Sequence, residues 1–300
     1  MKVQVVSGFL GSGKTTLLRG VLAVTPAGER VAVLINELGA VGIDGRILEG
    51  KAVRLVELTS GCICCTLKGS LAAAIEEIDV TAAPARLFIE TTGVAQPGEL
   101  LEVLAYPELA GRVTVAPVVT VVDASKFPAL RKVLGEFYSE QIRRAQVVVL
   151  NKEDLVGPAQ MDEVAREVAR LNPTARLLRA TRGAVDPALL AEGHGPPPEP
   201  ARPGLGWPTF DAVTLRAEGI LDRERLEAFL RELDPAIFRA KGYVRLAEGA
   251  FLLQYATGHW ELEPADRPAD GRLVFVGTHL DRSALEQALV NCQAGIGEPR

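Results

Sequence analysis

The glycine-rich stretch GFLGSGKT at residues 8–15 constrains this chain more than any other part of its sequence. It fits the pattern GxxxxGK[ST], follows a β-branched apolar run at residues 2–7 and opens a helix-like segment, Thr15–Val24. Glycines let successive backbone N–H groups converge on phosphate oxygens, and the N-terminus of the following helix adds its dipole. The stretch therefore predicts a P-loop that binds the phosphates of a nucleotide.

Within this loop, we expect the amine of Lys14 to reach the β- and γ-phosphates and to take part in catalysis. We expect the hydroxyl of Thr15 to bind Mg²⁺. The residues predicted to hold the nucleotide phosphates and their Mg²⁺ are Gly8, Gly11, Ser12, Gly13, Lys14, Thr15 and Thr16.

Short apolar runs of strand length alternate with helix-like segments over the first part of the chain. The runs are β-branched and nearly continuous, which is typical of parallel strands covered on both faces. They lie at residues 2–7, 31–35, 53–58, 86–90, 118–122 and 146–150. Helix-like segments such as Leu67–Ile78 and Pro158–Leu171 separate them. This alternation predicts a doubly wound, mostly parallel α/β sheet, the P-loop NTPase fold, over residues 1–190.

The pattern changes in the last third of the chain. Residues 191–206 are rich in proline and glycine, which indicates a linker. Beyond it lie strand candidates at residues 210–216, 243–246, 250–256 and 272–276, and helix candidates at Asp222–Leu233 and Asp281–Val290. The last helix begins on an aspartate cap. We therefore expect a smaller α+β domain over residues 207–300.

The charge and the apolar runs exclude several kinds of partner. The net charge is -5, so the chain lacks the basic footprint that nucleic acid requires. No apolar run approaches the roughly 18–20 residues that cross a bilayer. The first apolar run leads directly into the P-loop, which argues against a cleaved signal. We expect a cytoplasmic protein that binds neither nucleic acid nor membrane, and its four cysteines then indicate metal or redox chemistry rather than disulfides.

The tetrapeptide NKED at residues 151–154 follows a late strand candidate and indicates the base. In an NKxD motif, the carboxylate of Asp154 accepts hydrogen bonds from N1–H and the exocyclic amine of guanine. Asn151 supports the loop and the other edge of the ring, and the stem of Lys152 lies along the base. Adenine lacks this pair of donors and would leave a buried carboxylate unsatisfied, so the motif favours GTP over ATP.

Two glutamates and a glycine are candidates for the catalytic machinery. Glu90 ends a strand candidate, where P-loop proteins hold Mg²⁺ directly or through water. Glu37 follows the second strand candidate in a glycine-rich segment typical of a switch loop. Gly93 can give its N–H to the γ-phosphate. The alternative for Glu90 is a solvated side chain before a turn.

Three further residues are left open. Asp44 is either part of the switch loop or a turn residue, and Asp123, which closes a strand candidate, is either functional or structural. No glutamine stands out for positioning the attacking water, although Gln96 lies near Gly93 in the sequence. We therefore expect slow intrinsic hydrolysis that a partner accelerates.

Three cysteines crowd into the stretch CICC at residues 62–65, just past a strand candidate. The thiolates of Cys62, Cys64 and Cys65 suit Zn²⁺, Cu(I) or Co²⁺. A fourth ligand has to come from Glu37, a histidine, water or a client protein, and this incompleteness favours a transfer or sensing site over a closed structural zinc site. The CxxC spacing of Cys62 and Cys65 leaves redox chemistry open, with inert packing as the third alternative.

The remaining cysteine and the histidines carry no assigned chemistry. Cys292 lies on the terminal helix candidate and is predicted to be a buried small hydrophobe. His194, His259 and His279 are predicted to be structural.

The segments GFLGSGKTT, NELG, ELTSGCICCTL, ETTGVAQP and NKED, in this order, resemble the CobW-type family of P-loop GTPases. The tail, with RAKGYVRL, HWELEP and LVFVGTHLDRSALEQAL, is similar to the C-terminal domain of that family. The resemblance implies a metallochaperone or metal-insertion GTPase for zinc, cobalt or another divalent ion. It implies that the three CxCC cysteines bind the metal under nucleotide control, with Glu37 and Glu90 near the Mg²⁺ and the switch elements.

The chain departs from the family pattern in two places. Family switch loops often read NEFGEVGID, whereas Ala40 here replaces the second glutamate. Many relatives carry a histidine-rich stretch near the linker, whereas this linker contains only His194. A secondary metal site on that glutamate and a metal-collecting tract are therefore not expected.

These observations predict a GTPase that couples the binding of GTP and Mg²⁺ to the capture of Zn²⁺ or Co²⁺. Hydrolysis would then release the metal to a client metalloprotein, and a homodimer is left open. Two alternatives remain at this point: a P-loop ATPase or kinase with structural thiols, and a thiol-based redox regulator that only holds nucleotide.

Overall fold

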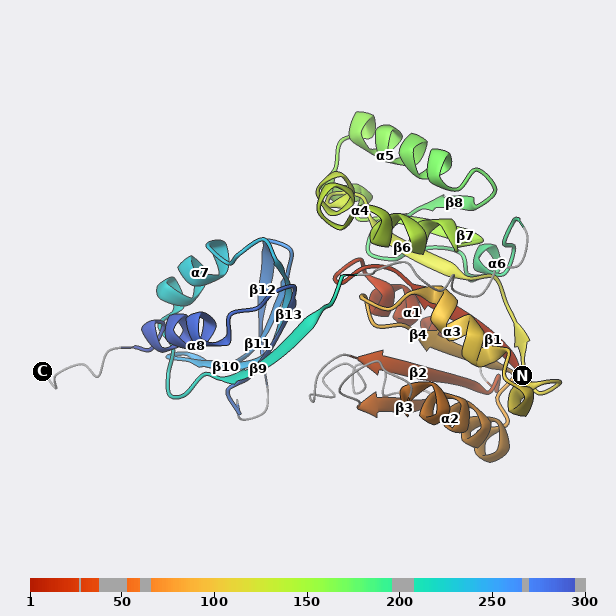
Figure 1. Ribbon diagram of the computed structural model, residues 1–300, viewed down its shortest axis with the longest axis horizontal. Coiled ribbons are helices and arrows are strands. Elements are labelled where there is room, and N and C mark those ends of the chain that lie inside the picture. The colour runs from red at the N-terminus through yellow and green to blue at the C-terminus, as the bar shows by residue number, and fades with distance from the viewer. Residues whose placement is uncertain (27, 38–52, 60–65, 196–207, 266–269, 295–300) are drawn as a thin grey trace, which may run out of the picture. The chain divides into compact units, whose positions relative to one another are not determined.

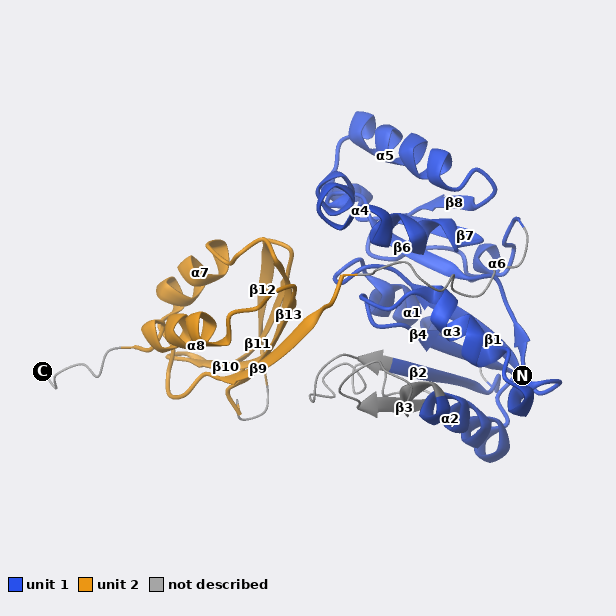
Figure 2. Cartoon of the chain, in the orientation of Figure 1, with its two compact units in different colours: residues 1–37, 42–207 blue, residues 38–41, 208–300 orange. Residues whose placement is uncertain are grey.

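The computed structural model describes residues 1–26, 28–37, 53–59, 66–195, 208–265 and 270–294. These residues form two compact units, which Figure 2 shows in different colours, and the main division along the chain falls between residues 207 and 208. Each unit has a sheet and a core of its own. The limits predicted from the sequence, 1–190, 191–206 and 207–300, stay a prediction.

The first unit is built on a parallel sheet. Its strands are β1 (Lys2–Ser7), β2 (Val31–Glu37), β3 (Val53–Thr59), β4 (Arg86–Glu90), β5 (Thr114–Val115), β6 (Val119–Asp123), β7 (Val147–Asn151) and β8 (Arg176–Arg179). They follow the order β3-β2-β4-β1-β6-β7-β8, and β5 also pairs with β1. Parallel strands need a crossover between them, and helices provide most of these crossovers. The predicted doubly wound sheet is confirmed.

Helices lie on both faces of this sheet (Figure 1). They are α1 (Lys14–Ala23), α2 (Thr66–Ala82), α3 (Pro97–Leu104), α4 (Phe127–Arg143), α5 (Pro158–Leu171) and α6 (Pro187–Leu190). Among the described residues, no helix has the length and apolar character needed to cross a bilayer.

Strand β2 shows why these runs are apolar throughout. Val31, Val33 and Ile35 pack in the cluster that includes Leu17 and Leu18 of α1. The intervening residues of β2 pack in a different cluster, with side chains of α2 and α3. Successive side chains of a strand point to opposite faces, so a sheet covered on both faces needs apolar residues at every position.

The second unit is an antiparallel sheet with two helices on one face (Figure 1). Its elements are β9 (Asp211–Arg216), α7 (Arg223–Arg231), β10 (Ile237–Leu246), β11 (Gly249–Ala256), β12 (His259–Pro264), β13 (Arg272–Gly277) and α8 (Arg282–Asn291). The strands follow the order β12-β11-β10-β13-β9. Strand β10 begins six residues before the predicted run at residues 243–246. The prediction missed the first part of this strand because Arg239 and Lys241 interrupt its apolar pattern.

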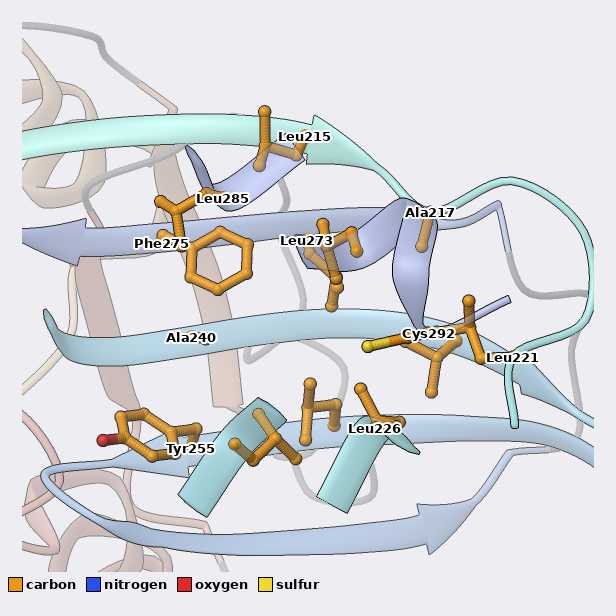
Figure 3. Close-up of a cluster of buried hydrophobic side chains, with 14 of the residues drawn as sticks. Leu215, Ala217, Leu221, Leu226, Ala240, Tyr255, Leu273, Phe275, Leu285 and Cys292 are labelled. Carbon is orange, nitrogen blue, oxygen red and sulfur yellow. The ribbon is translucent and has the colours of Figure 1, made fainter. Parts of the chain in front are cut away.

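The core of the second unit lies between the sheet and its helices (Figure 3). Phe275 and Leu273 of β13 contribute side chains from the sheet, and Leu226 and Leu285 contribute from the helices. Cys292 is buried in this cluster, as predicted. Burial raises the pKa of its thiol, which keeps it neutral and inert.

Aspartate caps begin both helices of this unit. The side chain of Asp281 accepts a hydrogen bond from the amide of Ala284, which confirms the predicted cap of α8. Asp222 accepts from the amide of Arg225 at the start of α7 in the same way. Each cap satisfies one of the backbone donors that a helix leaves without a partner in its first turn.

Candidate functional site

The site residues of the first unit converge because its strands are parallel. Parallel strands present their carboxyl ends at one edge of the sheet, and loops there form the ligand sites of such folds. The register places Val6 beside Glu90 and Asp123 beside Asn151. The P-loop follows β1 at the same edge. Phosphate, Mg²⁺ and base candidates that lie far apart in the sequence therefore meet at one edge.

The P-loop wraps around the amine of Lys14. The Nζ atom donates to the carbonyl oxygens of Gly8 and Phe9 at 2.8 and 3.3 Å, and the side chain is buried. Ser12 is also buried, and its hydroxyl has no hydrogen-bond partner within the described residues. A phosphate oxygen is the kind of acceptor that such a hydroxyl lacks. Gly11 and Thr16 lie exposed in the loop and in the first turn of α1.

Gly13 shows that the loop is shaped by close backbone approach. It adopts a left-handed conformation with φ of 102°, and a Cβ there would lie 2.3 Å from Nδ2 of Asn151. Only glycine avoids both the strain and the collision. The loop thus presents bare backbone where a phosphate group would bind, so these residues fit a nucleotide.

The Mg²⁺ candidates are in direct contact. The hydroxyl of Thr15 donates to Oε1 of Glu90 at 2.8 Å, and Glu90 is buried at the end of β4. A hydroxyl and a carboxylate are hard oxygen ligands of the kind that Mg²⁺ prefers. The donor set therefore fits a Mg²⁺ ion beside the P-loop.

Asn151 joins three loops at this edge. Its Nδ2 donates to the carbonyl of Ser12 at 2.8 Å, and its Oδ1 accepts from the amide of Gly183 at 2.8 Å. The side chain is almost fully buried. Asn151 therefore ties the P-loop to the loop after β8. Gly183 carries no recognisable motif in the sequence, where it is only a glycine shortly after a weak strand.

Lys152 and Asp123 form an ion pair beside the predicted base site. Lys152 Nζ lies 2.8 Å from Oδ2 of Asp123, and the backbone of Lys152 is left-handed with φ of 62°. Oδ1 of Asp123 accepts from the amide and hydroxyl of Ser125 at 2.9 and 2.6 Å. Asp123 is thus a structural support for Lys152. Asp154 is exposed in the short 3-10 helix that follows, where its carboxylate is open to a ligand.

The loop after β4 packs against the P-loop. A Cβ on Gly93 would lie 2.4 Å from the backbone nitrogen of Leu10, so a larger residue would push the two loops apart. Gln96 is buried in this loop, and its Nε2 donates to the carbonyl of Phe137 in α4 at 3.0 Å. Gln96 therefore points into the protein and does not position water in this arrangement.

The metal candidates lie largely outside the described residues. Cys62, Cys64 and Cys65 fall in the connection between β3 and α2, and Asp44 falls in the stretch after β2; neither stretch is described. Glu37 is described by its backbone only, which pairs with Thr59 at the end of β3. Within the described ranges, which include all three histidines, no three His, Cys, Asp or Glu residues are placed to hold a metal ion.

Known proteins resemble this chain over both units. Residues 2–179 match the family described as CobW/HypB/UreG, nucleotide-binding domain, and residues 210–293 match the cobalamin synthesis protein cobW C-terminal domain. The chain is 30% identical to the zinc chaperone CobW of Sinorhizobium sp., with 95% of each chain covered. It is 31% identical to the zinc chaperone CobW of Pseudomonas aeruginosa, with 96% of this chain and 90% of the relative covered.

A solved structure shares the fold. The zinc-bound YjiA GTPase from E. coli superposes with a TM-score of 0.50 at 22% identity, and the match covers 98% of this chain and 99% of that chain. At this identity, the likeness concerns the fold alone.

Proposed function

This P-loop GTPase belongs to the CobW/HypB/UreG family of nucleotide-binding proteins, and from that premise we propose that it carries a transition metal under the control of GTP. The membership confirms the resemblance seen in the motifs. We propose that the cargo is Zn²⁺, because the relatives of near full length are named zinc chaperones, with Co²⁺ as the second ion that thiolates accept.

The nucleotide half of the proposal is supported by the contact between Thr15 and Glu90. We propose that these two oxygens hold Mg²⁺, which would neutralise charge on the phosphates when bound. Lys14 would exchange its carbonyl partners for the β- and γ-phosphates, and the N–H of Gly93 would reach the γ-phosphate. Hydrolysis then breaks the bond between the β-γ bridging oxygen and the γ-phosphorus, with water supplying the new oxygen.

The preference for guanine is supported by the way Asn151 and the Asp123–Lys152 pair fix their loops. With its neighbours fixed, Asp154 is free to face the guanine N1–H and amine. We propose that these loops select guanine over adenine, because adenine offers the carboxylate no such pair of donors.

The single observation that carries the metal half is the sheet order. Strand β3 leads into the CxCC motif, β2 ends at Glu37, and β4 ends at Glu90, and these three strands are adjacent. We propose that a γ-phosphate bound beside Glu37 and Glu90 also assembles the ligands Cys62, Cys64 and Cys65. The site would then pass its ion to a client metalloprotein in the cytoplasm, where thiols stay reduced.

The test is a titration of Co²⁺ into the full chain, followed by cobalt–thiolate absorption. We expect a non-hydrolysable GTP analogue with Mg²⁺ to tighten metal binding roughly 5–150-fold over GDP, the range typical of coupled sites. Equal affinity with the GTP analogue, with GDP and without nucleotide would overturn the proposal, because a ligand that binds both states equally shifts no equilibrium.

A matched cysteine variant makes the test specific. Replacing Cys62, Cys64 and Cys65 together by Ser should abolish the cobalt–thiolate band. Cys292→Ala should leave the band and its nucleotide dependence intact, because Cys292 lies in the core of the other unit. A band that survives the triple substitution would place the metal elsewhere.

A further inference from the structure

We infer that Gln141 of α4 is a positioning residue for GTP hydrolysis, which it serves by holding the loop of residues 91–96 against the P-loop. The inference rests on the proposed function, because it takes Gly93 of that loop as a γ-phosphate contact. Gln141 lies in α4, far in the sequence from the P-loop and outside the strand pairs that bring the nucleotide motifs together.

The side chain of Gln141 is directed at this loop. Its Nε2 donates to the carbonyl oxygens of Gly93 and Ala95 at 3.2 and 3.1 Å, and the residue is completely buried. Its own backbone carbonyl accepts from the hydroxyl of Thr120 in β6 at 2.9 Å. Gln141 is thus fixed to the sheet through its backbone and fixes the loop through its amide group.

A second glutamine completes the link from the other side. Gln96 of the loop donates to the backbone of α4 at Phe137, while Gln141 of α4 donates to the backbone of the loop. Two buried amide groups therefore join the same two segments in opposite directions. The segment of α4 around Phe137 and Gln141 is therefore tied to the loop of residues 91–96 by three hydrogen bonds.

The link bears on the nucleotide site because the loop that it holds lies against the P-loop. A Cβ on Gly93 would fall 2.4 Å from the backbone nitrogen of Leu10. Because Gly93 sits directly against Leu10, a shift of a few tenths of an ångström in the loop reaches the P-loop backbone.

Helix α4 is built to support such a link. It is kinked at Gly135, whose φ and ψ of 52° and -119° are not helical. Phe137 and Gln141 both lie in the segment after this kink, so the part of α4 that holds the loop is set off from the part before Gly135. The hydroxyl of Ser139 donates to the carbonyl of Gly135 at 2.9 Å and satisfies one backbone group at the kink.

The experiment compares Gln141→Met with Gln4→Met in the full chain. Methionine keeps the length of the side chain and removes the amide donor. Gln4 is the matched control, since its buried Nε2 also donates to two carbonyls, those of Pro117 and Leu190, at 3.1 and 2.8 Å. Its partners lie outside the P-loop and the loop of residues 91–96. Both variants therefore lose a comparable pair of hydrogen bonds, one buried and one partly buried.

We expect Gln141→Met to lower kcat for GTP by about tenfold or more while KM and GDP affinity stay within about twofold, the signature of a group that acts on the transition state. Gln4→Met should lose as much stability but keep kcat. Gln96→Met, which breaks the link from the other side, should repeat the kinetic effect and serves if Gln141→Met does not fold.

The outcomes separate this inference from the proposed function. Equal kcat in Gln141→Met, Gln4→Met and the parent protein would overturn the role of Gln141 and leave the proposed function standing. A kcat loss shared equally by both methionine variants would also overturn it, because the effect would then be general destabilisation. A parent protein that binds GTP but shows no nucleotide-dependent metal binding would contradict the proposed function and leave the kinetic comparison valid.

Discussion

The hydroxyl of Thr15 donates a hydrogen bond to Oε1 of Glu90 across 2.8 Å, which joins the first turn of α1 to the end of β4. These residues are separated by 75 positions in the sequence and belong to different strand–helix units. Their contact is the geometric core of the proposed Mg²⁺ site, because two hard oxygen atoms meet beside the loop that binds phosphate.

Replacing Thr15 by Val removes the hydroxyl and keeps the shape of the side chain. We expect kcat for GTP to fall on the order of 100-fold, the scale seen when one preorganised polar group is lost from a charged transition state. Hydrolysis measured over a range of Mg²⁺ concentrations checks this. Thr25→Val is the control, since the hydroxyl of Thr25 donates only to the carbonyl of Val21 at the end of α1. Equal hydrolysis in the two variants would remove Thr15 from the Mg²⁺ site.

Asp154→Asn should change the base preference. The amide can accept only one of the two guanine donors, so we expect GTP to bind roughly 10–100-fold more weakly. Xanthine nucleotide, which carries an oxygen in place of the exocyclic amine, should bind better than it does to the parent chain. Competition binding with GTP, xanthosine triphosphate and ATP measures both effects. If guanine preference is unchanged, the residues 151–154 are not the specificity loop.

Asp123→Asn tests whether the ion pair with Lys152 supports base binding. The asparagine can still accept from the amide of Ser125, but it no longer holds the ammonium of Lys152 with a charge. We expect GTP and GDP to lose affinity together, each by about tenfold, or ~1.4 kcal/mol. Calorimetric titration of both nucleotides checks this. A loss confined to GTP would instead place Asp123 on the γ-phosphate side of the site.

Tyr138→Phe should raise stability at neutral pH. Tyr138 is buried beside Phe9 and Phe127, and its hydroxyl has no partner among the residues that the structure describes. Removing an unsatisfied hydroxyl should add about 1 kcal/mol to the free energy of unfolding. Tyr255→Phe should show a smaller gain, since the backbone of Gly258 offsets part of the cost of burying its hydroxyl. Urea unfolding of the two variants and the parent measures the difference.

Tyr138→Phe should also change how the free energy of unfolding depends on pH in alkaline solution. Burial, reinforced by the charge of Asp123, raises the pKa of Tyr138 well above its ordinary value. In the unfolded chain, a tyrosine loses its proton near pH ~10, so above that pH the folded state holds one more proton. The contribution of protonated Tyr138 to the free energy of unfolding is therefore fully present below pH ~10. Above that pH it is lost at up to ~1.4 kcal/mol per pH unit. Tyr138→Phe should lack that slope, and equal slopes would show that Tyr138 ionises freely.

Several parts of the site follow from the sequence alone. The P-loop can be recognised without the fold, because the glycines, Lys14 and Thr15 all lie within one strand–loop–helix segment. The apolar runs of the sheet are similarly local, since burial on both faces requires an apolar residue at every position. The aspartate caps of α7 and α8 also act on their own first turn, so Asp281 could be identified from sequence.

Other parts needed the fold, because they depend on pairs that are distant in the chain. Asp123 could not be assigned from sequence, and its contact with Lys152 decides its role as a structural support. No glutamine stood out for positioning water, and Gln96, which lies near Gly93 in the sequence, instead donates its amide to α4. Neither residue carries a local pattern that distinguishes a ligand contact from a tertiary one.

Four features can be recognised in the linear sequence: a phosphate loop, a guanine motif, a thiol cluster and the α/β alternation that carries them. Short-range patterns encode these features because the residues that make each one are neighbours in the chain. The contacts between distant groups depend on the folded chain, as in Thr15 with Glu90, Asn151 with Gly183 and Gln141 with Gly93. Strand order and register set those contacts, and they arise from packing across the whole sheet, which no single segment specifies.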